Sequence, residues 1–491
     1  MIKNTNLFTV QYGYSYEDDK LNFQLKKEIN GKVLSINCNA AINFDKDISD
    51  MCLLIGKISN AESIKARYSL QGYKDEDILL RLFEIYGKDA LRVIKGSFAA
   101  FIALDSRLYL ISGAVTGPSL YYYIGSDNNF FVSTELKRFP KKLVSLNKFE
   151  ETKEERLYLD NSVTLFEGVN KVTPGNIIEI SLTDRSMKKF HYYSPNRMID
   201  IFDEEEAAEV IRSSMAGFYS QFEEGECANC LVSGGLDSSI VAYLASKKFS
   251  KLELYSIGTE EHNEFGYAEV FANSINRKLQ KKIISEEEYF KYYVELISII
   301  EHGFSKYLEY LTPVHMAHYS LENKRYKLLS GYGSDILFAG FAKGKMHTQE
   351  VSDLVWSEYV STAWSNEMSQ GLESVFDMDI YYPFFDNDVI DSSFRIDPRL
   401  KFHNNIEKYI LRKAFQNDIS EEVVWRKKVG IHQGSGCEDY FTRIFGLSNL
   451  SEKKVRKAKD FIAYHIFKMI FVDGVNYKNI SLDNVKNILA H

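Results

Sequence analysis

One loop, residues 231–239, constrains what this chain can fold into more than any other stretch. Its sequence is Leu-Val-Ser-Gly-Gly-Leu-Asp-Ser-Ser. An apolar pair leads into the loop and apolar residues at helical spacing follow it, a pattern typical of a strand, a tight loop and a helix. Such a turn aims backbone N–H groups from the positive end of a helix, where anions bind.

The residue types in this loop suit a polyphosphate. Gly234 and Gly235 let N–H groups approach a phosphate closely. Hydroxyl donors are added by Ser233, Ser238 and Ser239. Asp237 would repel phosphate unless a cation lay between them, so we predict that it holds Mg²⁺. The spacing is not that of a P-loop and no lysine follows it. A simple Gly/Ser-rich turn is the alternative interpretation.

A second loop, residues 328–335, reads Leu-Leu-Ser-Gly-Tyr-Gly-Ser-Asp and also follows a short apolar run. Ser330 and Gly331 suit a loop that faces a nucleotide. Asp335 would supply a second carboxylate to the same Mg²⁺. A type II or type I′ turn would account for the glycines equally well.

The rest of the chain predicts two domains, residues 1–200 and 201–491, because 491 residues exceed one ordinary core. The first has short alternating strands and one clear amphipathic helix over 76–86, which predicts an α+β domain built on antiparallel sheets. The second opens with a capping pattern, Asp203 followed by Glu206. Strands and helices then alternate, which predicts an α/β domain with a parallel sheet, followed by added helices.

Composition restricts the partners and the compartment. The net charge is −8, which gives no basic footprint for nucleic acid or an anionic membrane. No apolar run approaches the roughly 20 residues of a membrane span and no signal peptide opens the chain, so we expect a cytoplasmic protein. Five cysteines suit a reducing compartment. Cys227 and Cys230 form a Cys-x-x-Cys, but without a second pair at metal spacing buried thiols are favoured over a redox or zinc site. Homo-oligomer formation stays open.

Four stretches of the first domain resemble the glutaminase domain of class II amidotransferases such as asparagine synthetase. They are residues 96–102, 117–122, 133–137 and 168–175. The resemblance implies layered antiparallel sheets of the Ntn-hydrolase type. In that family a cysteine follows the initiator methionine and attacks glutamine, whereas Ile2 stands here and the first cysteine is Cys38. The resemblance therefore implies a retained fold without glutamine hydrolysis.

The two glycine-rich loops together resemble the ATP pyrophosphatase domain of asparagine synthetase-like enzymes, whose fold is adenine nucleotide alpha hydrolase-like. Those enzymes split ATP into AMP and pyrophosphate while they adenylate a carboxylate. The resemblance implies that backbone groups of Val232 and Ile257 contact adenine. Asparagine synthetases usually have Glu where Tyr332 stands, and tyrosine there resembles β-lactam synthetases, including carbapenam synthetase.

Three further positions extend that resemblance. In that family the tyrosine pairs with a downstream glutamate as a base, and Glu367, within Ala-Trp-Ser-Asn-Glu, looks like that partner. Lys428, within residues 424–435, resembles the lysine that stabilises charge in the transition state. An exposed basic patch of residues 426–428 is the alternative; we expect Lys427 to face solvent and Lys428 to point inward. Tyr381 stands where relatives usually have arginine, which predicts a different wall of the acceptor pocket.

The resemblance therefore implies an ATP- and Mg²⁺-dependent ligase that forms a β-lactam from a small β-amino acid resembling carboxymethylproline, as in carbapenem-type antibiotic biosynthesis. Three alternatives remain. An ammonia-dependent asparagine synthetase is disfavoured by Tyr332 and Ile2. A lasso-peptide cyclase would use the same adenylation on a peptide. A non-catalytic pseudo-synthetase is disfavoured by the presence of Asp237, Asp335 and Lys428.

Overall fold

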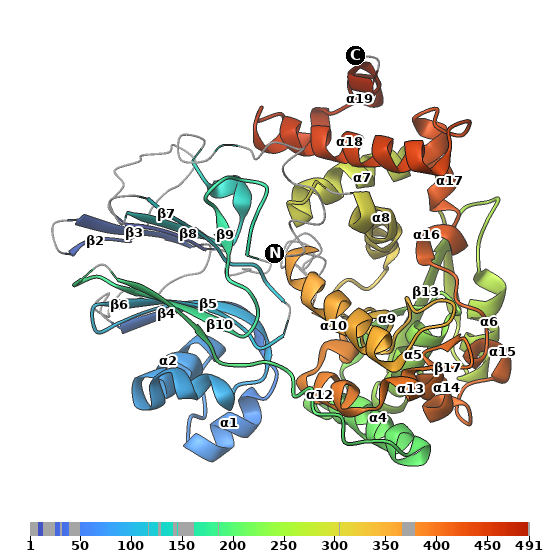
Figure 1. The fold of residues 1–491 in the computed structure, drawn as a ribbon, viewed down its shortest axis with the longest axis horizontal. Helices are drawn as coiled ribbons and strands as arrows, with labels where there is room; N and C mark the ends of the chain where they lie inside the picture. The colour runs from blue at the N-terminus through green and yellow to red at the C-terminus, as the bar shows by residue number, and fades with distance from the viewer. Residues whose placement is uncertain are drawn as a thin grey trace. The chain divides into compact units, whose positions relative to one another are not determined.

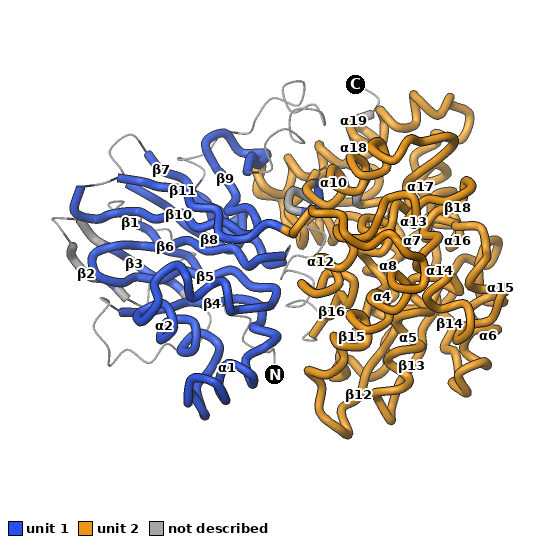
Figure 2. Tube along the Cα trace, turned by 60° about the horizontal axis from the view of Figure 1, so that its bottom comes forward, with its two compact units in different colours: residues 1–194, 361–374 blue, residues 195–360, 375–491 orange. Residues whose placement is uncertain are grey.

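The structure is a computed structural model, and its chain divides into two compact units (Figure 2). Unit 1 comprises residues 1–194 and 361–374, and unit 2 comprises residues 195–360 and 375–491. The residues that the structure describes are 8–12, 25–29, 32–38, 50–115, 117–125, 129–140, 145, 162–184, 186–303, 305–365 and 379–489. None of the helices in these ranges is both long enough and apolar enough to span a bilayer.

The described residues of unit 1 form two antiparallel sheets and the helices α1 and α2 (Figure 1). The six-stranded sheet has the order β2 (Leu25–Ile29), β3 (Lys32–Cys38), β1 (Phe8–Tyr12), β8 (Phe130–Ser133), β7 (Tyr121–Ile124) and β9 (Asn170–Lys171). The five-stranded sheet has the order β11 (Met187–His191), β10 (Asn176–Ser181), β6 (Arg107–Ser112), β5 (Gly96–Leu104) and β4 (Asp50–Ile58). The helices are α1 (Ala61–Tyr68) and α2 (Asp75–Tyr86), followed by the 3₁₀ turns Gly87–Arg92 and Leu136–Arg138.

Strand β5 shows why this unit is layered. Its side chains alternate between two faces, as the period of a strand requires. Phe101 packs into a core with residues of the other sheet, such as Phe8 and Leu34. Phe98 packs into a second core with residues of α2, such as Phe83. The predicted α+β domain on antiparallel sheets is confirmed, and α2 begins one residue before the predicted helix. The finer Ntn-hydrolase likeness stays a prediction.

Unit 2 is built on a parallel sheet with the order β14 (Leu279–Ile283), β13 (Lys251–Gly258), β12 (Cys227–Leu231), β15 (Lys327–Leu329) and β16 (Ile380–Tyr381). The chain adds β13 and β14 on one side of β12 and then β15 and β16 on the other. The strand order therefore reverses between β12 and β15, which is the point of a doubly wound sheet where ligands bind. The predicted parallel sheet is confirmed.

The helices of unit 2 follow the predicted alternation closely. Asp203 caps α4 by accepting a hydrogen bond from Glu206 N at 2.9 Å. From the start of unit 2 to β16, the described helices are α4 (Glu204–Phe218), α5 (Leu236–Lys248), α6 (Phe265–Ser274), α7 (Glu286–Ile300), α8 (Ser305–Ser320), α9 (Ser334–Leu337) and α10 (Thr348–Ser365). Helix α7 begins with a capping box in which Ser285 and Glu288 bond to each other's backbone N–H groups.

After β16 the described chain is mainly helical, and most of its helices are short. Its helices are α12 (Asn387–Arg395), α13 (Pro398–Lys401), α14 (Tyr409–Phe415), α15 (Glu421–Val424), α16 (Ile431–Gly434), α17 (Cys437–Ile444), α18 (Glu452–Phe471) and α19 (Leu482–Leu489). A small hairpin, β17 (Phe402–His403) and β18 (Ile406–Glu407), separates α13 from α14. The remaining 3₁₀ turns are Tyr219–Gln221, Pro383–Phe385 and Tyr477–Asn479.

Candidate active site

The first loop connects β12 to α5, with Gly235 at the N-cap of the helix. Gly234 has φ +71°, and a Cβ there would lie 2.6 Å from both Ala268 N and Tyr267 Cβ. Both its backbone angle and its close contact with α6 therefore require glycine. The predicted strand, tight loop and helix are confirmed.

The serines of this loop do not all lie alike. Ser238 Oγ accepts a hydrogen bond from Ser233 N at 3.2 Å, and Ser233 Oγ accepts one from Gly235 N at 3.3 Å. These contacts close the loop upon itself. The side chain of Ser239 is fully buried, and its Oγ has no hydrogen-bond partner among the described residues. Nucleotide binding by these serines stays a prediction.

The second loop lies against the first, as its position at the switch point requires. A Cβ at Gly331 would lie 2.7 Å from Ser238 N and 2.9 Å from Asp237 C. Glycine is therefore needed for the approach of the two backbones and not only for a turn. Gly333, with φ +106°, then turns the chain into α9, whose second residue is Asp335.

The two predicted aspartates meet at one buried ammonium group that the sequence analysis missed. Lys408 Nζ lies 2.5 Å from Asp237 Oδ2 and 2.7 Å from Asp335 Oδ1, and it donates to Ser334 Oγ at 3.1 Å. Its side chain is only 2% exposed. Lys428 Nζ approaches the same cluster, 2.6 Å from Asp335 Oδ1 and 3.2 Å from Gly340 O. Two carboxylates and two ammonium groups thus form a compact four-charge cluster.

The opposite charges in this cluster stabilise one another's ionised forms. Burial disfavours the charged form of Asp335, but the ammonium groups of Lys408 and Lys428 outweigh it and lower the pKa of that carboxyl to about 2. Burial likewise opposes the Lys408 ammonium, but Asp237 and Asp335 outweigh it and raise its pKa. Asp335 and Lys408 are therefore both charged at neutral pH, and a polyphosphate would meet a fixed cation at Lys408.

The carboxylates of the cluster also fit Mg²⁺ in chemical type, because hard cations take carboxylate oxygens. Asp237 Oδ2 is committed to Lys408, but Asp237 Oδ1 is buried and has no hydrogen-bond partner among the described residues. That oxygen is the one best suited to a cation. Magnesium binding by Asp237 and Asp335 stays a prediction.

The basic stretch 426–428 is not one exposed patch. Arg426 pairs with Glu264, donates to Gly234 O at 3.4 Å and lies over the Tyr267 ring at 3.7 Å. Arg426 therefore braces the first loop. Lys427 faces solvent and Lys428 points into the cluster, as predicted.

Aromatic residues surround Tyr332 and the end of β16. Tyr332 stacks on Phe385, with ring centroids 5.7 Å apart, and meets Tyr382 edge-on at 6.1 Å. Tyr381 instead packs on Phe218 and Phe222, at 6.4 and 5.0 Å. The ring contacts of Tyr332 are thus with Phe385 and Tyr382, whereas those of Tyr381 are with Phe218 and Phe222. The predicted difference in the acceptor wall at Tyr381 stays a prediction. Glu367 lies outside the described residues.

The adenine-side positions lie at the ends of neighbouring strands. Val232 N donates to Tyr255 O at 2.8 Å, which leaves the Val232 carbonyl as the group that could read a base. Ile257 is buried near the end of β13. Two residues on, Thr259 N donates to Ser435 O at 3.0 Å, so the segment after Lys428 lies beside this strand end.

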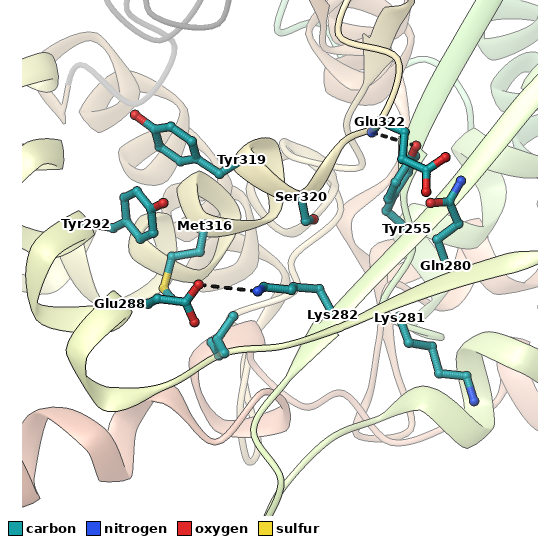
Figure 3. A pocket seen from close by; sticks show the side chains of 11 residues that line it. Tyr255, Gln280, Lys281, Lys282, Glu288, Tyr292, Met316, Tyr319, Ser320 and Glu322 are labelled. Atoms are coloured by element: carbon teal, nitrogen blue, oxygen red, sulfur yellow. Dashed lines mark hydrogen bonds and ion pairs between the residues drawn. The ribbon is translucent and has the colours of Figure 1, made fainter.

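Two other features fall outside this site. Cys230 is buried and Cys227 half-buried on β12, and neither belongs to the group of possible metal ligands found among the described residues, Glu309, His432 and Glu438. A cleft of about 280 Å³ beside β14 holds the Lys282–Glu288 ion pair and a hydrogen bond from Glu322 N to Tyr255 (Figure 3). Its lining contains none of the predicted site residues.

Comparison with known proteins assigns this chain to a family. The asparagine synthase family model matches residues 220–374 and 367–473, more than half of the chain, and the glutamine amidotransferase domain model matches residues 43–193. The chain belongs to the asparagine synthase family. It is accordingly an ATP-dependent amide ligase.

Individual relatives cover most of the chain at low identity. Carboxyethyl-arginine beta-lactam-synthase of Streptomyces clavuligerus is 26% identical, over 85% of this chain and 80% of that protein. A putative asparagine synthetase of Methanocaldococcus jannaschii is 22% identical, over 82% of this chain and 80% of that protein. Among solved structures, NMN synthetase from Francisella tularensis matches 57% of this chain and 98% of that one, at 12% identity and a TM-score of 0.28.

Proposed function

We propose that this chain is an ATP- and Mg²⁺-dependent synthetase that closes a β-lactam within a β-amino acid resembling carboxymethylproline, as in carbapenem-type antibiotic biosynthesis. The four-charge cluster of Asp237, Asp335, Lys408 and Lys428 is the observation that carries the proposal. It presents two fixed ammonium groups where the loops after β12 and β15 meet. That is where a triphosphate would be split.

The first step is adenylation. A carboxylate oxygen of the substrate attacks the α-phosphorus of ATP, and the bond to pyrophosphate breaks. Lys408 and Lys428 stabilise the charge that develops on the leaving pyrophosphate, while N–H groups of residues 233–239 hold it. Bound Mg²⁺ would add positive charge beside Asp237 and Asp335. The fixed ammonium groups need no rearrangement as the reaction proceeds.

The second step is ring closure. Tyr332, with Glu367 as its proton acceptor, removes a proton from the substrate amine, whose nitrogen attacks the acyl carbon of the adenylate. The C–N bond forms, the bond to AMP breaks, and a four-membered ring results. An ordinary phenol has a pKa of about 10, so a neighbouring carboxylate is needed to make it a useful base. Holding the amine beside the carbonyl supplies much of the catalysis.

The identity of the residue at 332 supports ring closure over ammonia transfer. The Streptomyces relative is by its name a β-lactam synthase that uses carboxyethyl-arginine. Carboxyethyl-arginine is therefore a second candidate substrate for a β-lactam-forming synthetase of this kind. In each turnover of the proposed cyclase the substrate would lose the elements of one water, and one AMP and one pyrophosphate would form.

The test is pyrophosphate release by the purified chain with ATP, Mg²⁺ and one substrate at a time. Carboxymethylproline is expected to give pyrophosphate and a product lighter by one water in mass spectrometry. Turnover of carboxyethyl-arginine alone would overturn the carbapenam assignment and keep the class. Turnover of aspartate with ammonia alone would favour an asparagine synthetase, which the amidotransferase-domain match and several relatives also support. Turnover of a peptide alone would indicate a cyclase of lasso type. Absence of release with every substrate would indicate a non-catalytic homologue.

A further inference from the structure

A second cavity of unit 2 is lined by two cationic side chains and by no Asp or Glu among the described residues. It has a volume of about 290 Å³ and lies among the segment that precedes α4, helix α10 and the segment from α12 to α13. Its cations are Arg197 and Lys401, its polar neutral groups are Gln349 and Ser352, and apolar side chains such as Phe394 complete it. None of these residues belongs to the four-charge cluster.

Lys401 is the unusual member of this lining. The residue is 3% exposed, and it forms no ion pair among the described residues. Its amine donates to Ser393 Oγ at 3.0 Å. Ser393 in turn donates its hydroxyl proton to Leu337 O at 2.8 Å, so Ser393 accepts from Lys401 and fixes the position of the amine. The nitrogen also lies 5.5 Å from the ring centre of Phe394.

The second cation approaches the cavity from the surface. Arg197 is exposed, and its guanidinium carbon lies 4.3 Å from the ring centre of Trp356. It forms no ion pair among the residues that the structure describes. The planar guanidinium is well suited to carboxylate or phosphate, which it can bind through two parallel hydrogen bonds.

Proteins rarely bury a charged group without a partner, because desolvation is costly. A buried amine at one wall of a cavity, a free guanidinium at its mouth and apolar side chains between them complement an amphipathic anion. We propose that this cavity binds a small organic anion, a carboxylate or a phosphate monoester with an apolar body. The anionic group lies between Lys401 and Arg197, and the body packs on Phe394 and Val355. The volume is near the lower end of ligand sites, about 300 Å³, which suits a compact ligand.

Burial lowers the pKa of Lys401 to about 7. The amine is therefore near its charge transition at neutral pH, and a bound anion would favour the ammonium form. Either form donates hydrogen bonds, so the site keeps a donor throughout. The inference uses no residue of the proposed reaction and does not rest on the proposed function.

Trp356 provides a direct test, because Arg197 lies over its ring. The full chain is titrated with cyclohexanecarboxylate and, separately, with cyclohexyl phosphate, while tryptophan fluorescence is recorded. We expect a saturable change with at least one anion and none with the neutral analogue cyclohexylmethanol. Loss of the signal in Trp356→Phe would assign it to this position.

Variants separate binding from general effects. Arg197→Met, at an exposed position that leaves the fold intact, and Lys401→Met should each weaken binding at least tenfold. Lys345→Met, which removes an exposed lysine elsewhere in unit 2, should bind as the natural chain does. The proposal is overturned if neither anion gives a saturable change, if the alcohol binds as well as the anions, or if Arg197→Met binds unchanged.

Discussion

Two buried lysines, seven positions apart along the chain, have opposite surroundings. Lys408 lies between two carboxylates and keeps its charge, with its pKa raised. Lys401 has a hydroxyl as its partner and no carboxylate among the described residues, and burial lowers its pKa to about 7. The hairpin β17–β18 joins them.

The difference shows what burial alone does to a lysine and what paired carboxylates add. Desolvation acts on both amines, so only the partners distinguish them. Lys408 is a permanent cation suited to a polyphosphate. Lys401 is near its charge transition at neutral pH, and a bound anion would favour its ammonium form. The same residue type thus supports two kinds of anion site in one unit.

Lys408→Met should have the largest effect. It leaves Asp237 and Asp335 without their shared cation in a buried site, which costs about 3 to 5 kcal/mol in comparable cases. We expect pyrophosphate release to fall by roughly a thousandfold or more, because the site loses a fixed charge and its geometry. Urea unfolding and a pyrophosphate assay would measure both losses.

Lys413→Met is the matched control for that variant. Lys413 lies on α14 just after Lys408 and pairs with Glu204 at 3.0 Å at a partly exposed site. Such pairs contribute about 0 to 1 kcal/mol, so stability and activity should change little. Equal losses in the two variants would remove the distinction between Lys408 and a surface lysine.

Lys428→Met should separate the effect of a lost charge on activity from any effect on stability. Lys428 is 27% exposed and Asp335 keeps Lys408, so the fold should be retained. Pyrophosphate release should fall by roughly a hundredfold to a thousandfold, as on removal of one group that stabilises a developing anion. Lys427→Met, at the exposed neighbour, should behave as the natural chain. Full activity of Lys428→Met would contradict its role in the cluster.

Lys401→Met should stabilise the protein at neutral pH. The folded chain holds this amine at a pKa of about 7, against an ordinary 10.5, so between those values the unfolded chain binds a proton that the folded chain does not. Stability of the natural chain therefore rises with pH across that window, by about 1.4 kcal/mol per pH unit at most. The advantage of the variant should be largest, on the order of 4 kcal/mol, at or below pH 7 and should shrink toward pH 10. Urea unfolding in a buffer without carboxylates or phosphate measures it. A constant difference across that range would contradict the unpaired state of Lys401.

Gly331→Ala should have the smallest effect of these changes. The added methyl group would press on Ser238 N and Asp237 C and move the two loops apart. We expect a loss of about 1 to 3 kcal/mol in stability, as for overpacking, and a decrease of roughly tenfold in pyrophosphate release. Gly266→Ala is the control, since nothing lies within 4 Å of a Cβ there and Gly266, like Gly331, has no positive φ. A loss in Gly331→Ala that this control lacks therefore reports the close contact with the first loop.

The parts of the site that could be predicted from sequence are those that depend on residues close together along the chain. The strand, loop and helix around residues 231–239 and the capping pair Asp203–Glu206 are each set by neighbouring residues, and the structure confirms both. Lys428 was identified through a resemblance that extends over its neighbours. Local patterns thus predicted both loops and the sheet that carries them.

Lys408 could not be identified in that way. It is a lysine between Glu407 and Tyr409, in left-handed backbone with φ +55°, and nothing local distinguishes it from a surface residue. A charge argument could have found it, because two carboxylates brought to one buried point need a cation.

The most direct test of the proposed chemistry follows the oxygen atoms of the substrate carboxylate. The purified chain is incubated with ATP, Mg²⁺ and carboxymethylproline whose carboxylate carries heavy oxygen, and the products are weighed by mass spectrometry. Attack on the α-phosphorus followed by ring closure predicts one heavy oxygen in AMP, none in pyrophosphate and one in the lactam. Heavy oxygen in inorganic phosphate, with ADP as the nucleotide product, would contradict adenylation at the four-charge cluster.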